Sequence, residues 1–179
     1  MILRTLVSSD STGDCSGSVA IPAIPLVSND GTIFLYSDLS GSIFRLDRSL
    51  AVAPGWPFKA GESRTTPRPG LETEHEAGYC PTPLAPAAGP DGTLLVALEA
   101  PNPDVGGSLV AIGADGRVRP GWPVGLKRAG SEFWAIAVGS DGTTFALAVE
   151  PESGGKSSAT VLSLSPDSTV RWSTTVVNP

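Results

Sequence analysis

Charged side chains that could bind a ligand or move a proton gather in the segment Lys59–Tyr79, and a second polar group lies in Glu99–Gly107. Carboxylates and a histidine at close spacing can hold a metal ion or form an acid–base pair. A solvated loop is the alternative interpretation. The side chains that we treat as candidates for ligand or partner binding are Arg64, Arg68, Glu72, Glu74, His75, Glu76, Asn102 and Asp104.

The rest of the sequence limits which catalytic and metal-binding functions these segments could have. His75 is the only histidine, so the chain cannot build a histidine-based triad or a multi-histidine metal site by itself. No Asp-x-Asp-x-Asp-Gly pattern of a calcium loop occurs, and no glycine pair precedes a helix as a phosphate loop requires. We therefore expect binding residues in these loops, but no catalytic residue, no metal and no cofactor.

Composition excludes two classes of partner. The 12 Lys and Arg residues against 18 Asp and Glu give a net charge of -6, and no basic patch is present that could follow a phosphate backbone. No run of 18 apolar residues could cross a membrane as a helix. The chain contains 21 Gly and 17 Pro among 179 residues, which favours many turns over long helices.

Three Asp-Gly-Thr turns divide the chain, and each is followed by a short apolar run. Asp-Gly supplies the positive φ of a tight hairpin, so each turn predicts a strand on either side. The three turns are Asp30-Gly31-Thr32, Asp91-Gly92-Thr93 and Asp141-Gly142-Thr143.

A second repeated motif follows the first. Pro54-Gly55-Trp56-Pro57 matches Pro120-Gly121-Trp122-Pro123 without a gap, and the third copy reaches Trp172 if the Pro-Gly pair is deleted. Each repeat then holds four short strands: one before Asp-Gly, one after it, one in the next apolar run and one near the Trp. Four antiparallel strands at a period near 50 residues are typical of a β-propeller blade. The predicted fold class is all-β, built of such blades.

These motifs resemble a known family. Gly31-Thr32-Ile33-Phe34-Leu35-Tyr36, then Gly41-Ser42-Ile43-Phe44-Arg45-Leu46-Asp47, then a Trp that closes the unit, are similar to the PQQ-type, or quinoprotein-like, propeller repeat. The resemblance covers about residues 20–179. It implies a family that includes quinone-dependent dehydrogenases, outer-membrane assembly factors and extracytoplasmic proteins, so an extracytoplasmic or cell-surface location is expected.

The dehydrogenases of that family carry adjacent cysteines, Ca²⁺ ligands and a catalytic Asp around the cofactor. Cys15 and Cys80 are 65 residues apart, and none of the family's cofactor residues can be assigned to a position here. We therefore expect a chain that is not an enzyme. Because the two cysteines occupy similar places in successive repeats, a disulfide between blades is a hypothesis, with two free thiols as the alternative.

The repeats predict three blades, at residues 20–66, 78–127 and 131–179. The N-terminal stretch 1–19 contains Ile2–Val7, which reads as a strand that completes a neighbouring blade. Known propellers close with typically four to eight blades. We therefore expect either a part of a longer propeller or a homo-oligomer, in which two copies would give six blades.

Strand order predicts where binding takes place. The tight Asp-Gly turns lie at one end of each blade, and the longer connections Glu99–Gly107, Glu150–Ser158 and Lys59–Tyr79 gather at the other. Long loops on a rigid scaffold commonly carry binding sites. We expect Trp56, Trp122 and Trp172 to pack between adjacent blades, and Trp134 to lie in the core.

The sequence thus predicts a non-catalytic propeller segment that binds a protein or a glycan through its loop end. The alternative is a segment of a larger quinoprotein-like or sugar-handling enzyme whose catalytic residues lie elsewhere. A purely structural repeat in a cell-surface assembly is a third possibility.

Overall fold

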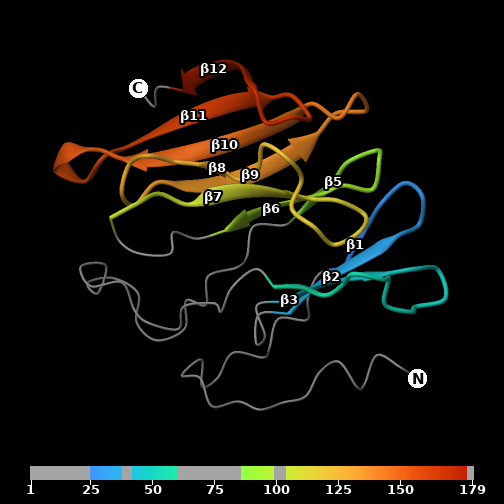
Figure 1. Cartoon of the computed structure of the whole chain (residues 1–179). Helices are drawn as coiled ribbons and strands as arrows, with labels where there is room; N and C mark the ends of the chain where they lie inside the picture. The colour runs from blue at the N-terminus through green and yellow to red at the C-terminus, as the bar shows by residue number, and fades with distance from the viewer. Residues whose placement is uncertain (1–24, 38–41, 60–85, 99–103, 177–179) are drawn as a thin grey trace, which may run out of the picture.

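The structure is a computed structural model, and it describes residues 25–37, 42–59, 86–98 and 104–176. These residues form three four-stranded antiparallel sheets, which we call blade 1, blade 2 and blade 3, and within each sheet the strands follow chain order (Figure 1). Blade 1 contains β1 (Leu26–Val27), β2 (Ile33–Ser37), β3 (Ser42–Leu46) and β4 (Phe58–Lys59). Blade 2 contains β5 (Ala87–Ala88), β6 (Leu94–Leu98), β7 (Ser108–Ile112) and β8 (Val124–Gly125). Blade 3 contains β9 (Glu132–Val138), β10 (Thr144–Pro151), β11 (Ser157–Leu164) and β12 (Val170–Val176).

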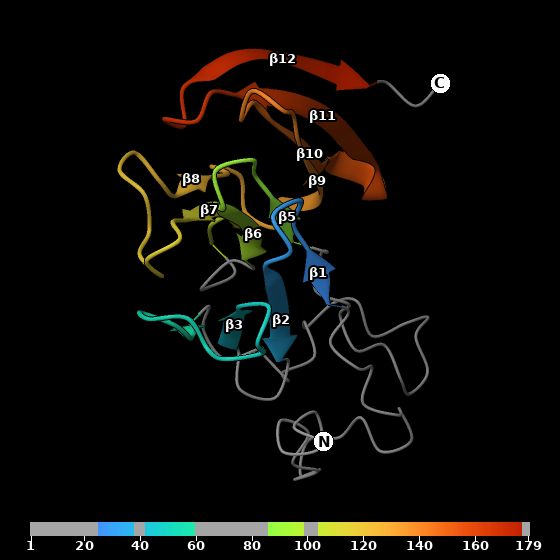
Figure 2. The same ribbon diagram turned by 90° about the vertical axis from the view of Figure 1, so that its right-hand side faces the viewer.

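The three sheets lie face to face, with blade 2 between the other two (Figures 1 and 2). The only helical element in the described part of the chain is the single turn η1 (Ser153–Gly155). Consecutive four-stranded antiparallel sheets that stack on one another are blades of a propeller. The predicted fold class is therefore confirmed.

The Asp-Gly turns between the first two strands of each blade have the predicted geometry. Gly31, Gly92 and Gly142 all have a φ between 76° and 81°, which glycine adopts without steric cost. In each turn the Asp Oδ1 atom accepts the backbone N–H of the following Thr, at 2.9 Å, 3.1 Å and 3.0 Å in chain order. This side-chain bond mimics a backbone turn and fixes where the second strand begins.

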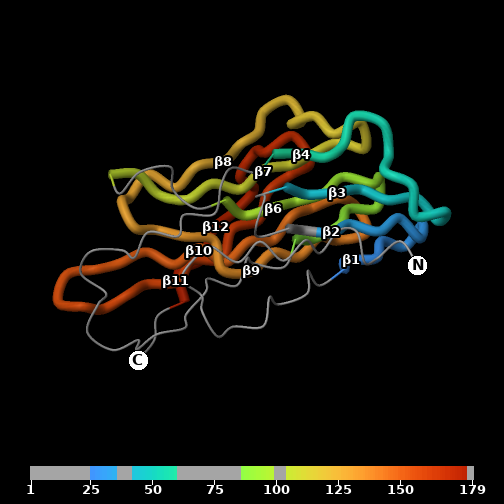
Figure 3. The backbone as a smooth tube through the Cα atoms, turned by 90° about the horizontal axis from the view of Figure 1, so that it is seen from below, coloured from blue at the N-terminus to red at the C-terminus, as the bar shows by residue number. Residues whose placement is uncertain are grey.

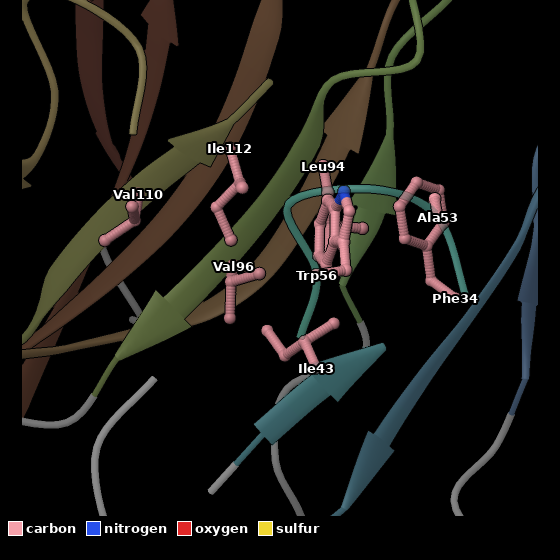
Figure 4. Packing of buried hydrophobic residues seen from close by; sticks show 8 residues of the cluster. All are labelled: Phe34, Ile43, Ala53, Trp56, Leu94, Val96, Val110 and Ile112. Carbon is pink, nitrogen blue, oxygen red and sulfur yellow. The ribbon is translucent and has the colours of Figure 1, made fainter. Parts of the chain in front are cut away.

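The core consists of two apolar layers, one at each junction between blades. The layer between blades 1 and 2 is shown in Figure 4 and contains Phe34, Ile43, Ala53, Trp56, Leu94, Val96, Val110 and Ile112. The layer between blades 2 and 3 contains Leu95, Leu109, Ala111, Trp122, Phe133, Ala146, Ala148 and Leu164. Both faces of blade 2 are therefore buried, which explains why its strands are apolar without alternation.

The strand registers show which positions of the three blades are equivalent. Ile33 pairs with Leu46, Leu94 with Ile112, and Thr144 with Leu164. Counting from these pairs makes Phe34, Leu95 and Phe145 one set of equivalent positions. Successive residues of a strand point to opposite faces, so Phe34 and Leu95 face the next blade along the chain and Phe145 faces the outer side of blade 3.

One local prediction differs from the structure. Strand extends into both ends of the expected loop Glu150–Ser158, because β10 runs to Pro151 and β11 begins at Ser157, so the connection is the tip of a long hairpin. Gly154 and Gly155, both with a φ near 75°, turn the chain at its tip. Cys15, Cys80 and the segment Ile2–Val7 that is predicted to form a strand lie outside the described residues, so the disulfide and the blade boundaries stay predictions.

Candidate functional site

Each of the first two junctions between blades is fixed by a tryptophan. The Trp56 Nε1 atom donates to the carbonyl oxygen of Ala114 at 3.1 Å, and Trp122 Nε1 donates to that of Pro166 at 3.2 Å. Both side chains are only 8% exposed. The acceptors lie in the turn between the third and fourth strands of the next blade. The prediction that Trp56 and Trp122 pack between blades is therefore confirmed.

The Pro-Gly-Trp-Pro loop makes this contact possible. Gly55 has a φ of 84°, and a Cβ atom there would lie 2.1 Å from the carbonyl oxygen of Asp115. In return, a Cβ atom on Gly116 would lie 2.3 Å from the carbonyl oxygen of Gly55. The two backbones approach so closely that both positions require glycine. The peptide bonds Trp56-Pro57 and Trp122-Pro123 are both cis.

The outer face of blade 3, which we define by Phe145, Leu147, Val161 and Trp172, has the same kinds of residue but no cover. Phe145 and Trp172 lie in ring contact, with centroids 6.1 Å apart, much as Phe34 and Trp56 do at 5.7 Å. Phe145 is 38% exposed and Trp172 is 47% exposed. No element of the described residues packs against this side of the sheet (Figure 2). Contiguous exposed aromatic surface of this kind marks an interaction site.

Two predictions about tryptophan are wrong. Trp172 does not pack between blades, because the described residues contain no blade beyond β12 to receive it. Trp134 was expected in the core but is 56% exposed. It lies where the pairing of β9 with β10 shifts register, between the partners of Leu147 and Ala148. A bulge of this kind redirects a side chain away from the direction that alternation would give it.

A small cleft with both polar and apolar walls opens between blades 2 and 3 at the end that holds the Asp-Gly turns. Its volume is about 190 Å³, and its walls include Asp91, Arg119, Trp122 and Asp141. The Arg119 guanidinium lies 2.5 Å from Asp91 Oδ2 and donates to Thr93 Oγ1 at 2.6 Å. The equivalent arginine of blade 3, Arg171, donates to Thr143 Oγ1 at 2.9 Å and lies 3.9 Å from Asp141 Oδ2.

The electrostatics of the turns keep their carboxyls ionised. For Asp91, burial raises the pKa, but hydrogen bonds from Thr93 and the charge of Arg119 outweigh it, so the pKa is lowered overall. Hydrogen bonds from Thr143, with a smaller effect of Arg171, lower the pKa of Asp141. In blade 1 a hydrogen bond from Ser28 is the largest of the effects that lower the pKa of Asp30 to about 2. At neutral pH these groups accept hydrogen bonds and do not donate protons.

Most of the candidate residues from the sequence fall outside the described residues. They are Arg64, Arg68, Glu72, Glu74, His75, Glu76 and Asn102, and their role stays a prediction. Asp104 is described: it is exposed in the connection from β6 to β7. That connection lies at the end of the blades that also holds the β10–β11 hairpin tip, opposite the Asp-Gly turns (Figure 3).

Sequence reasoning missed the outer face of blade 3. One signal could have indicated it: the third repeat lacks the Pro-Gly pair that precedes Trp56 and Trp122, so its indole cannot be placed in the same loop. Among the described residues no group of three or more histidine, cysteine, aspartate or glutamate side chains could hold a metal ion. The helices of the described part include none that could span a membrane.

The chain is similar to known proteins in its three-dimensional structure, but no similar family or curated sequence is found. No protein-family model matches the chain, and no curated protein sequence matches it. A solved structure of a protein of unknown function from Bacteroides caccae is 18% identical, with a TM-score of 0.47, over 86% of this chain and 41% of that one. Virginiamycin B lyase from Staphylococcus aureus is 14% identical, with a TM-score of 0.43, over 87% of this chain and 55% of the lyase. A catalytically inactive form of that lyase with quinupristin gives 14% identity and a TM-score of 0.44, over 90% and 58%.

The chain therefore spans about half the length of the solved structures that it matches. The architecture confirms the β-propeller class, and the finer resemblance to PQQ-type repeats has no matching family model. The prediction that the chain is not an enzyme is wrong as a conclusion from this architecture, because the similar structures include streptogramin B lyases, which are enzymes. The absent quinone ligands and histidine triad excluded two chemistries only, and the exposed loops of a propeller can carry others.

Proposed function

We propose that the chain is a β-propeller segment that binds a protein partner, and that the outer face of blade 3 is the binding surface. The observation that carries this proposal is the exposure of the Phe145–Trp172 pair, at 38% and 47%, on a face whose equivalents in blades 1 and 2 are buried. Large aromatic side chains at the centre of a patch commonly supply most of the binding energy of a protein interface.

The exposed backbone and the apolar surface around the Phe145–Trp172 pair also support protein binding. Leu147 and Val161 are cross-strand partners next to the aromatic pair and are only half-buried. β12 is exposed along its whole length from Val170 to Val176 and forms the edge of the sheet. An exposed edge next to an apolar face readily pairs with another chain unless a partner covers it.

Site-specific cross-linking tests the proposal in the cells that make the protein. A photoreactive amino acid replaces Leu147, and mass spectrometry identifies the peptide that is attached to it. We expect an adduct to one defined protein surface, and we expect Trp172→Ser to abolish it. The matched control places the same amino acid at Lys156, which is exposed at the tip of the β10–β11 hairpin. If position 147 gives no protein adduct, or gives the same adducts as position 156, the proposal is wrong.

The charged residues in the cleft between blades 2 and 3 support a second candidate function, the binding of a glycan. Ionised carboxylates and a guanidinium, as Asp91, Asp141 and Arg119 provide, accept from and donate to sugar hydroxyls. The volume of about 190 Å³ suits a single sugar unit rather than a chain. Binding of a panel of monosaccharides, compared between the wild type and Arg119→Met, tests this function. Mass analysis of the recovered sugar shows whether it is only bound or also converted.

A further inference from the structure

The two junctions inside the chain define what the outer face of blade 3 should receive. In both, an indole N–H donates to a carbonyl that lies two residues after the end of the third strand of the next blade: Ala114 follows Ile112, and Pro166 follows Leu164. The equivalent residue of blade 1, two after Leu46, is Arg48. Its turn has the same backbone hydrogen bonds, from the Asp47 N–H to the Ala51 carbonyl and from the Leu50 N–H to the Asp47 carbonyl.

Blade 1 differs from blade 2 at the position that meets the preceding blade. Gly116 has a φ of 78° and touches the Pro-Gly-Trp-Pro loop of blade 1, so that a Cβ atom there would collide with it. The equivalent residue in blade 1 is Leu50, which adopts a φ of 64° and is 43% exposed. The equivalent residue of blade 3 is Ser168, with a φ of 72°, and its Oγ donates to the Gly121 carbonyl of the loop that it meets, so a small side chain is accommodated at this position. The larger Leu50 side chain would occupy the space of that loop in a blade placed before blade 1.

Blade 3 is the one blade of the described residues that meets this requirement. Its fourth strand, β12, runs without interruption from Val170 to Val176 where the other two blades insert the Pro-Gly-Trp-Pro loop. The outer face of blade 3 thus lacks the loop that would exclude Leu50. The two irregularities, a leucine where blades 2 and 3 have glycine and serine and a missing loop, fit each other.

The apolar surface of blade 1 is also suitable. Ile33, Leu35 and Phe44 alternate with residues that face blade 2, so they point to the opposite side of the sheet. They are half-buried, whereas their equivalents Leu94, Val96 and Val110 are buried against blade 1. This side of blade 1 has the apolar character that a further blade junction requires.

We propose that the partner on the outer face of blade 3 is blade 1 of a second copy of this chain. In this junction the Trp172 indole N–H donates to the Arg48 carbonyl of the other copy, and Leu50 fills the space that the missing loop leaves. The same contact in the reverse direction closes two copies into a six-bladed ring, within the four to eight blades of known propellers. The inference rests on the proposed function, since it names the partner of that binding surface.

Light scattering on the purified full chain tests the stoichiometry. At micromolar concentrations we expect twice the 18.3 kDa of one chain. Trp172→Ala should raise the dimer dissociation constant at least about 30-fold, as expected for a central aromatic of an interface. A species of 18.3 kDa at all concentrations would overturn the inference.

The variant Leu50→Gly tests the interface between copies without weakening the fold of the single chain. Glycine relieves the positive φ at this position, so the monomer should unfold no more easily, while the dimer should dissociate more readily because the space is no longer filled. Val118→Ala, at an exposed position of blade 2 that the proposal does not use, is the matched control and should leave the dimer unchanged. A dimer that neither Trp172→Ala nor Leu50→Gly weakens would also overturn the inference.

The cross-linking experiment distinguishes this inference from the proposed function. An adduct from position 147 to a blade 1 peptide of the same sequence supports both. An adduct to a different protein, together with a monomeric purified chain, supports the proposed function and overturns the second copy as its partner.

Discussion

The face that blade 2 turns toward blade 3 and the face that blade 3 turns outward have nearly the same architecture. The first presents Leu95 and Trp122, which are 3% and 8% exposed, and the second presents Phe145 and Trp172, which are 38% and 47% exposed. Each face combines an apolar residue of the second strand with a tryptophan near the fourth strand, and only the first face has a described blade packed against it. The comparison teaches that an apolar pattern in a repeat specifies a face to be covered, and does not specify what covers it.

The two faces also differ in how a neighbour would be held. The face of blade 2 has a glycine loop whose backbone fits against the next blade, where a Cβ atom on Gly121 would lie 2.7 Å from the carbonyl oxygen of Asp167. The face of blade 3 has no such loop and relies on side chains.

Truncating the two tryptophans should show the largest effect. Trp122→Ala should lower the free energy of unfolding by about 3–5 kcal/mol, since it empties a buried site. Trp172→Ala should lower it by less than about 1 kcal/mol at protein concentrations where the chain is monomeric. Denaturant titration at several protein concentrations measures both, because only the loss of an intermolecular contact depends on concentration. Equal losses for the two variants would show that Trp172 is buried within its own chain.

Adding a methyl group to two glycines should give an intermediate effect. Gly55 and Gly154 both have a positive φ, near 84° and 76°, so alanine costs about 1 kcal/mol at either position from backbone strain. Gly55→Ala adds a collision with the Asp115 carbonyl at the blade junction, while nothing lies within 4 Å of Gly154. The melting temperature should therefore fall further for Gly55→Ala than for Gly154→Ala. If the two melting temperatures fall equally, the close approach of blades 1 and 2 is not a constraint.

The ion pairs should give the smallest effect. Arg119→Met should cost about 0.5 kcal/mol at pH 7, since the pair is partly exposed and screened by solvent. Arg171→Met should cost less, because the guanidinium lies 3.9 Å from its carboxylate instead of 2.5 Å. The lowered pKa of Asp91 makes the stabilisation present above the unfolded pKa near 4, and it is lost as the pH falls through the lower folded pKa. The difference between the wild type and Arg119→Met in urea titrations should therefore vanish at low pH. A difference that persists there would show that Arg119 acts by packing.

The sequence predicted the blades well because their determinants are local. Asp-Gly turns and the position of each indole depend on a few adjacent residues, and Asp91, Gly92 and Trp122 behave as expected. Exposure could not be predicted in the same way, since it depends on whether another blade packs against the indole: Trp122 has blade 3 as its neighbour, and Trp172 has none among the described residues. The bulge that turns Trp134 outward depends on pairing with β10, which begins ten residues later, and the sequence of β9 alone does not show this pairing.

The β10–β11 hairpin extends past the other connections of the described blades, and at its tip Gly154 has no atom within 4 Å that an added side chain would meet. Its strands are held by their own ladder from Thr144–Leu164 to Pro151–Ser157. Foreign sequence between Gly154 and Gly155 would therefore be displayed at the end of a stiff two-stranded arm. The hairpin offers a position for an affinity tag or a fluorescent domain that leaves every blade junction untouched.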